Sequence, residues 1–117
     1  MEKIKILANK IKIEEVKELA KNWYGQMIKG SVDILRRRVA LGGDYHIESC
    51  KILVKDGSQD DNVWGFNIWF RDDGSNELGF NSLINIKPKL GNSSRSLSDP
   101  QIIAQAIEII KEFIELP

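Results

Sequence analysis

The spacing of apolar residues changes several times in the first half of the chain, and each change predicts a new element. Residues 4–6 alternate between isoleucine and lysine, which predicts a short strand. Across residues 13–27 the apolar positions recur every three or four residues, with glutamates and lysines between them, which predicts a helix. A second helical spacing covers residues 28–39, and Gly42-Gly43 provides a natural end to it.

Strand-like alternation dominates the second half. Residues 50–54 predict a strand, although a short helix over residues 49–55 fits the same run. Residues 63–70 and 78–87 both alternate, the turn residues 72–76 join them, and Pro88 removes the backbone donor that a longer strand would need. These two segments predict an antiparallel hairpin.

Pairing in this hairpin separates the side chains into two faces, because successive residues of a strand point to opposite sides. One set is apolar and is expected to meet the helices, whereas the other set is rich in amides and is expected on the opposite face. The core set is Trp64, Phe66, Ile68, Leu78, Phe80 and Ile84, and the opposite set is Gly65, Asn67, Trp69, Gly79, Asn81, Leu83, Asn85 and Lys87.

The C-terminal segment predicts a loop followed by the most apolar helix of the chain. Residues 91–98 are small and polar, which is typical of a mobile loop. Ser98 and Gln101 then resemble a capping box, with Pro100 in the first turn and a wide stripe of isoleucines after it. This width predicts packing across the sheet or against a second copy, so a homodimer through this helix is expected.

The predicted order is strand, helix, helix, strand, strand, strand, helix. It indicates one α+β domain over residues 1–117, with a mainly antiparallel sheet and the helices packed on one face. A chain of 117 residues can bury a sufficient core without a disulfide or a structural metal, so no cofactor is required for folding.

Charge and cysteine content narrow the class of protein. Seventeen basic and seventeen acidic residues balance, which argues against nucleic acid and anionic membranes as partners. Cys50 is the only cysteine and therefore forms no internal disulfide, which is typical of a reducing compartment. Charges interrupt the apolar residues of the N-terminus, so no signal peptide or membrane span is expected, and the protein is predicted to be soluble and cytoplasmic.

One candidate for catalysis is the triplet Asp44, His46 and Glu48. On an extended segment this alternate spacing would point all three side chains in one direction. Two carboxylates and an imidazole could then hold a divalent metal or form an acid–base pair, as in a hydrolase or nuclease. A solvated polar edge after Gly42-Gly43 explains the same residues, and it is the commoner origin of such a triplet.

The second candidate is a binding surface on the amide-rich sheet face. Asparagines are poor strand formers, so Asn67 and Asn85 raise the question of what their amides bind, and Trp69 and Lys87 lie on the same predicted face. Water or a neighbouring loop would also satisfy these amides. Residues 91–95, which end in Arg95, could wrap an anion but match no phosphate-binding motif. The arginines at positions 36–38 would need Lys29, Lys87 or Arg95 nearby to form an anion site.

Five groups of residues along the chain occur together in a recognisable order. They are Met27-Ile28-Lys29 with Val32-Asp33, Leu41-Gly42-Gly43-Asp44-Tyr45-His46, Asp56-Gly57-Ser58-Gln59, Val63-Trp64-Gly65-Phe66-Asn67, and Ser82-Leu83-Ile84-Asn85-Ile86-Lys87-Pro88 with Gly91-Asn92. In this order they resemble a family of short prokaryotic proteins that is catalogued only as a domain of unknown function. The resemblance covers nearly the whole chain and implies no activity. In that family a glutamate usually stands at the position of Asp44 and an arginine at the position of Lys87.

The element order also resembles the RNA-cleaving toxins of the RelE type, which place two helices before an antiparallel sheet. Those toxins are usually strongly basic, whereas this chain is neutral, so the analogy is one of architecture. The leading hypothesis is therefore a domain that binds a small molecule or a protein on its sheet face. A metal-assisted or acid–base hydrolase centred on His46 is the alternative.

Overall fold

The computed structural model describes residues 3–116, which form three α-helices, a five-stranded antiparallel sheet and a small two-stranded parallel sheet. The larger sheet has the order β1-β4-β3-β5-β6, and β2 pairs with β7. In chain order the elements are β1 (Lys5–Ile6), β2 (Ile11–Lys12), α1 (Ile13–Ala20), β3 (Met27–Asp33), β4 (Arg38–Leu41), α2 (His46–Lys55), β5 (Val63–Phe70), β6 (Asn76–Gly79), α3 (Pro100–Phe113) and β7 (Ile114–Glu115).

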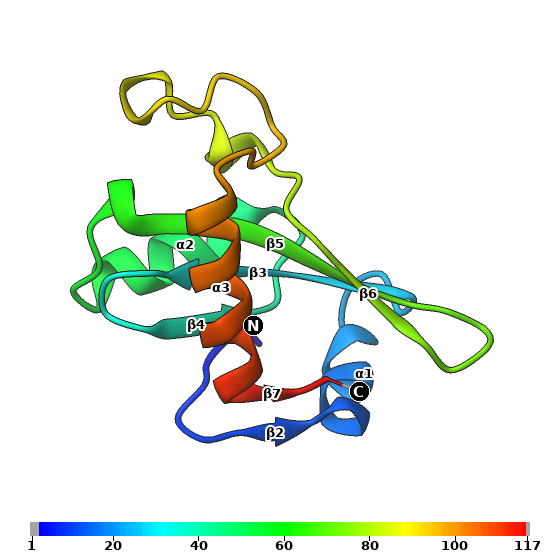
Figure 1. The fold of residues 1–117 in the computed structure, drawn as a ribbon. Helices are drawn as coiled ribbons and strands as arrows, with labels where there is room; N and C mark the ends of the chain where they lie inside the picture. Colours follow the sequence, from blue (N-terminus) through cyan, green and yellow to red (C-terminus); the bar gives the residue numbers. More distant parts are fainter. Residues whose placement is uncertain (1–2, 117) are drawn as a thin grey trace.

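The helices cover the two faces of the larger sheet unequally (Figure 1). α1 and α3 pack against one face, where their apolar side chains join Val32, Trp64 and Ile68 in the main core. α2 packs against the opposite face, where Cys50 and Leu53 meet Ala40 and Val63 in a smaller cluster. The predicted α+β class with a mainly antiparallel sheet is confirmed, and α2 is the helix that lies on the second face.

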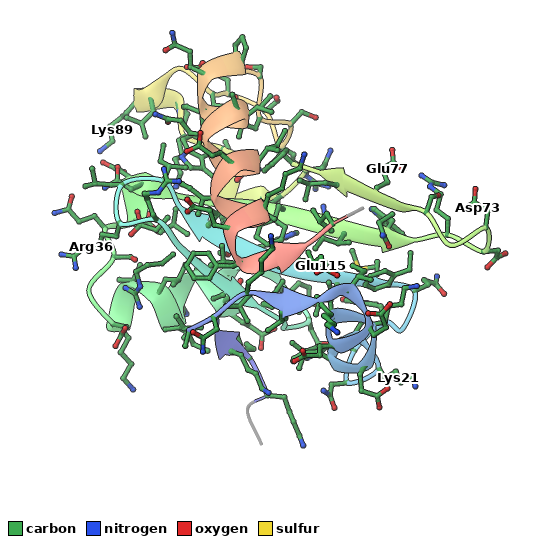
Figure 2. All side chains as sticks on the ribbon, turned by 60° about the horizontal axis from the view of Figure 1, so that its bottom comes forward. Lys21, Arg36, Asp73, Glu77, Lys89 and Glu115 are labelled. Atoms are coloured by element: carbon green, nitrogen blue, oxygen red, sulfur yellow. The ribbon has the colours of Figure 1, made fainter. Side chains whose placement is uncertain are left out.

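Charged side chains surround these layers rather than gathering on one side. In Figure 2, Lys21, Arg36, Asp73, Glu77 and Lys89 extend outward from different parts of the ribbon. This distribution agrees with the zero net charge of the sequence.

The predicted second helix is wrong, because residues 28–39 form the β3–β4 hairpin. A spacing of four residues fits one face of a strand as well as one face of a helix, and Ile28 and Val32 point from β3 into the main core. The four-residue connection contains Arg37 with φ of 55°, and Asp33 Oδ1 accepts the backbone N–H groups of Leu35 and Arg36 at 2.9 Å. Asp33 therefore shapes a turn, a role that aspartate often has.

The first predicted helix is shorter than its apolar stripe. α1 ends at Ala20, and Gly25 adopts a positive φ of 79° while its N–H bonds back to the carbonyl of Ala20 at 3.0 Å. Met27 at the end of the stripe then belongs to β3. A glycine with positive φ ends a helical path without a steric penalty, so Gly25 closes this helix.

For residues 49–55, the helix is the correct alternative. α2 begins at His46, and Glu48 Oε1 accepts the backbone N–H groups of Asp44 and Tyr45 at 2.7 and 2.9 Å. These bonds satisfy donors that a helix N-terminus leaves free. α2 lies close to the sheet because small residues meet there: the hydroxyls of Ser31 and Ser49 are 2.7 Å apart.

The register of the β5–β6 hairpin is confirmed where the two strands pair. Ile68 lies opposite Leu78, and Trp69 lies opposite Glu77. β6 ends at Gly79, however, and the predicted strand over 80–87 is replaced by a bridge from Asn81 to Ser96 and a 3₁₀ turn at Leu83–Asn85. The segment therefore leaves the sheet edge after four residues.

The last helix packs on its own sheet. Ala106, Ile109 and Ile110 of α3 are buried in the main core, so the apolar stripe already has a partner and the homodimer stays a prediction. Asp99 rather than Ser98 caps the helix, since Asp99 Oδ1 accepts the N–H of Gln101 at 2.9 Å. Across residues 3–116, no helix has the length and apolar character needed to cross a membrane.

Candidate functional site

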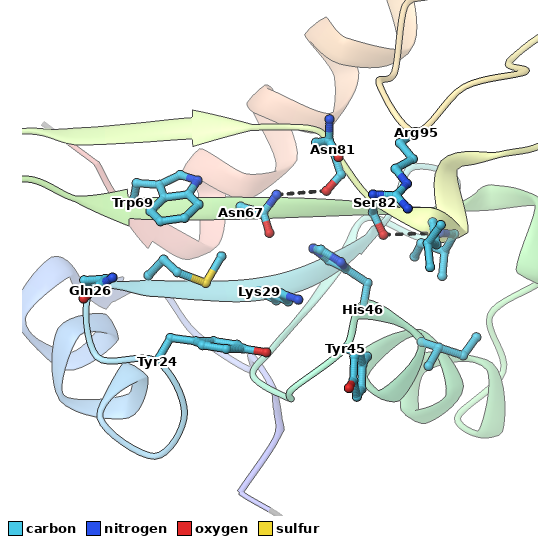
Figure 3. A pocket seen from close by; sticks show the side chains of 14 residues that line it. Tyr24, Gln26, Lys29, Tyr45, His46, Asn67, Trp69, Asn81, Ser82 and Arg95 are labelled. Carbon is cyan, nitrogen blue, oxygen red and sulfur yellow. Dashed lines mark hydrogen bonds between the residues drawn. The ribbon is translucent and has the colours of Figure 1, made fainter.

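A pocket of about 710 Å³ opens on the sheet face that α2 covers only in part (Figure 3). α2 lies over the half of this face that contains Ser31 and Val63. The remaining half, around Lys29, Asn67 and Trp69, forms the floor of the pocket. The site therefore exists because the second layer of the fold is incomplete at this end.

Two neighbouring strands provide the floor. In the antiparallel pair of β3 and β5, Met27 lies opposite Trp69 and Lys29 lies opposite Asn67. Side chains at alternate positions share one face, so these four residues point into the same space. The predicted separation of Asn67 and Trp69 from the core-facing residues of β5 is confirmed.

The walls come from three connections that are distant in sequence. Tyr24 follows α1, Tyr45 precedes α2, and residues 81–84 with Arg95 come from the long connection between β6 and α3. Tyr24 is fixed by its hydroxyl, which donates to the carbonyl of Asp44 at 2.7 Å. The pocket is therefore assembled from segments that no single sequence motif contains.

Gly65 allows two of these walls to approach the sheet. A Cβ atom at Gly65 would lie 2.7 Å from the side chain of Ser82 and 3.1 Å from Cδ2 of His46. Only hydrogen fits in that space. The close approach of the segment that contains Ser82 therefore explains why a glycine stands at this position of β5.

His46 lies at the inner end of the pocket and is 8% exposed. Its Nε2 is 3.0 Å from the carbonyl oxygen of Phe66, and because a carbonyl only accepts, Nε2 must carry the proton and donate. Burial lowers the pKa of His46 to about 4, with a smaller lowering by Lys29 and opposing effects from Phe66 and Asn67. The imidazole is therefore neutral at neutral pH, and Nδ1 is its free acceptor.

Asn67 contributes a hydrogen-bond acceptor that the fold leaves unused. Its Nδ2 donates to the carbonyl of Asn81 at 3.0 Å, which fixes the orientation of the amide. Its Oδ1 then points toward His46 and Lys29 (Figure 3) and is buried without a well-formed hydrogen bond. Such an unpaired acceptor costs about 1–3 kcal/mol, which is a common feature of sites that are built for something other than stability.

The charges of the pocket have one sign. Lys29 and Arg95 line it, and no aspartate or glutamate does so in the part of the chain that the structure describes. The Lys29 ammonium lies over the rings of Tyr24 and Tyr45, 5.2 and 5.5 Å from their centroids, and neither cation forms a salt bridge with any residue in the range 3–116. The pocket therefore presents uncompensated positive charge beside aromatic surfaces.

The structure brings together four of the eight predicted site residues: His46, Asn67, Trp69 and Arg95 all line the pocket. Lys29, which the sequence suggested only as a partner for an anion site, joins them. Sequence reasoning missed Tyr24 and Tyr45, because nothing in their neighbourhood shows that two chain connections meet at Lys29. A lysine within the otherwise buried strand β3 was the available signal.

Asn85 and Lys87 lie outside this pocket. Asn85 is completely buried, and its amide bonds to the N–H and carbonyl of Gly65 at 2.7 and 3.1 Å. The amide thereby replaces the strand partner that β5 lacks beyond the end of β6. Lys87 donates to the carbonyl of Asp60 at 3.0 Å and lies over the ring of Trp64. Their predicted place on the open sheet face was wrong because the segment leaves the sheet at Gly79.

The triplet Asp44, His46 and Glu48 does not have the extended geometry on which its shared direction depended. His46 and Glu48 are in the first turn of α2, and the Glu48 carboxylate binds backbone N–H groups instead of the imidazole. Among the residues described, no three His, Cys, Asp or Glu side chains gather as a metal site would require. The divalent metal thus stays a prediction without an observed set of ligands.

The fold and the pocket define a small α+β domain with a concave site on the partly covered face of an antiparallel sheet. The model of the family described as "Protein of unknown function (DUF5674)" matches residues 5–113, so the chain belongs to this family. The resemblance to a domain of unknown function is therefore confirmed. No curated protein and no solved structure matches the chain.

Proposed function

We propose that this protein binds a small organic molecule in the pocket lined by Lys29, His46, Asn67, Trp69 and Arg95. The observation that carries the proposal is convergence: side chains from two strands, the start of α2 and a distant loop meet in one concave space. Small-molecule sites are typically clefts of about 300–1,000 Å³ with mostly apolar walls and a few polar groups, and this pocket fits that description.

Exposure and unpaired polar atoms give further support. Trp69 is 42% exposed on a face whose other floor residues are mostly buried. Asn67 Oδ1 and His46 Nδ1 add two acceptors that form no well-formed hydrogen bond within residues 3–116. A ligand could donate hydrogen bonds to these acceptors and cover the indole, which would remove the energetic cost of leaving them without partners.

The proposal can be tested by NMR with a mixture of one-ring and two-ring aromatic fragments. The side-chain N–H signals of Trp69, Asn67 and Asn81 report directly on the pocket. We expect the fragments to shift these signals. In Trp69→Ala we expect the shifts at Asn67 and Asn81 to vanish while the variant stays folded, with a melting temperature lowered by a few degrees at most. The exposed Leu35, on the β3–β4 turn, gives the matched control Leu35→Ala.

Two results would contradict the proposal. One is the absence of any shift at the three reporting residues at millimolar fragment concentrations. The other is a set of shifts centred elsewhere, for example around Leu35, with Trp69→Ala responding like the parent protein.

An acid–base hydrolase is the second candidate, and the position of His46 favours it. The imidazole lines the pocket and is neutral at neutral pH with its proton on Nε2, so its Nδ1 can accept a proton. A pKa of about 4 nevertheless makes it a weak base. Hydrolysis of p-nitrophenyl acetate and p-nitrophenyl phosphate should be compared between the parent protein and His46→Gln. A rate that depends on His46 would favour the hydrolase, and equal rates would favour binding alone.

A further inference from the structure

We infer that the ligand of this pocket is a planar aromatic acid, held with its acidic group between Lys29 and Arg95 and its ring toward Trp69. This inference rests on the proposed function and adds the chemical class of the ligand. The inference depends on how charge and aromatic surface are distributed along the pocket, because one end carries the cations and the other end carries Trp69.

Positive charge lies at one end of the pocket. Figure 3 shows the Lys29 ammonium and the Arg95 guanidinium on two sides of His46, with both side chains reaching toward the cavity. His46 adds no charge at neutral pH because burial keeps its pKa near 4. With no carboxylate in the described lining, the group that best completes this end is an anion, either a carboxylate or a phosphate.

The other end is mainly apolar. Trp69 and Met27 are paired across β5 and β3, and Figure 3 places Trp69 with Gln26 at the end opposite Arg95. The half-exposed indole offers a face on which a ring can lie, and stacked aromatic pairs contribute about 0.5–1.5 kcal/mol beyond their buried area. Tyr24 and Tyr45 extend the aromatic surface beside Lys29.

Together the two ends require a molecule with an acid at one end and a ring at the other. The floor between them is short, since Asn67 is the only β5 residue on this face between Gly65 and Trp69. An acid attached to a one-ring or two-ring system by a short link spans it. A bare anion would leave Trp69 uncovered, and a neutral ring would leave both cations unpaired.

Two matched pairs of compounds test the acidic group. Indole-3-acetate is compared with indole-3-ethanol, and uridine 5′-monophosphate with uridine, by isothermal titration calorimetry. In each pair the ring is constant and the charge is removed. We expect the acid of at least one pair to bind about tenfold more tightly than its neutral partner, in a manner that weakens with added salt. The pair that responds distinguishes a carboxylate from a phosphate.

Two variants test the assigned cations. Lys29→Met and Arg95→Gln are each expected to weaken binding of the responding acid about tenfold and to leave its neutral partner unchanged. Lys89→Met and Arg71→Gln remove exposed cations outside the pocket lining and serve as matched controls. Melting temperatures show whether each variant is folded.

The outcomes separate this inference from the proposed function. The assignment of an aromatic acid as the ligand would be contradicted by equal binding of the acid and its neutral partner. Equal effects of the pocket variants and the control variants would also contradict it. A third result would also contradict this assignment: neither pair binds, while the aromatic fragments still shift the NMR signals of the pocket. In that case the proposed function would stand. If the fragments also leave those signals unchanged, both fail together.

Discussion

Asn67 and Asn85 are the same residue type and were predicted on the same sheet face, yet the structure uses them in opposite ways. Asn85 is fully buried, and both ends of its amide are bonded to the backbone of Gly65, with a further bond to the carbonyl of Phe80 at 3.3 Å. Asn67 makes one bond, to Asn81, and keeps a buried oxygen without a well-formed partner.

The difference teaches how to separate structural from functional polar residues. A buried amide whose donors and acceptor are all satisfied stabilises the fold, because removing it leaves backbone groups unpaired. A buried amide with an unused atom in a pocket contributes less to stability and is available to a ligand. The sequence pattern places the two on one sheet face, and only their hydrogen-bond partners distinguish them.

The same substitution at both positions should give the largest contrast. Asn85→Leu removes the partners of the Gly65 N–H and carbonyl, and we expect it to lower the free energy of unfolding by about 4 kcal/mol. Asn67→Leu removes one bond and also the unpaired oxygen, and we expect a loss of at most about 1 kcal/mol. Urea unfolding of both variants measures these two losses in unfolding free energy. Equal losses would contradict the distinction between a structural Asn85 and a functional Asn67.

The burial of His46 should make the stability of the protein depend on pH. Its pKa is about 4 in the folded protein and 6.5 when unperturbed, so between these values the unfolded chain binds the additional proton. Stability therefore falls as the pH drops from 6.5 to 4, by about 3 kcal/mol for this residue. The difference in unfolding free energy between the parent protein and His46→Gln, measured across this range, isolates it from the carboxylates. A difference independent of pH would show that the imidazole is accessible to water.

A methyl group at Gly65 should disturb both regions at once. Gly65→Ala places a Cβ atom against Ser82, which is 4% exposed, and close to His46. Overpacking of this kind costs about 1–3 kcal/mol, so we expect a loss near the middle of that range and altered NMR signals at Asn67. Gly79→Ala is the matched control, since no atom of the described residues 3–116 would lie within 4 Å of a Cβ at that position. Similar losses for the two alanines would argue for a general effect of glycine in strands.

The smallest effect on stability is expected at Trp69. Because its side chain is 42% exposed, Trp69→Ala should lower the free energy of unfolding by at most about 1 kcal/mol while it abolishes binding of the aromatic fragments. Trp64→Ala, in which a fully buried ring is lost, is the contrasting variant and should cost about 3–5 kcal/mol. Chemical denaturation of the two variants provides the comparison.

Local patterns in the sequence determined β5 and the last helix. Alternation over residues 63–70 predicted β5, its two faces and the outward position of Trp69, because a strand has a period of two in any context. The isoleucine stripe after Pro100 similarly predicted α3. These elements carry their signal in adjacent residues, so no other part of the chain was needed.

Tertiary structure decided the rest. Residues 28–39 carry apolar positions that suit both periods, and burial of β3 between two packed layers resolved them as a hairpin. The gathering of Lys29, His46 and Arg95 around Asn67 depends on contacts between segments far apart in the chain. Spacing within a segment fixes the direction of side chains relative to their neighbours, but only long-range packing fixes which segments share a pocket.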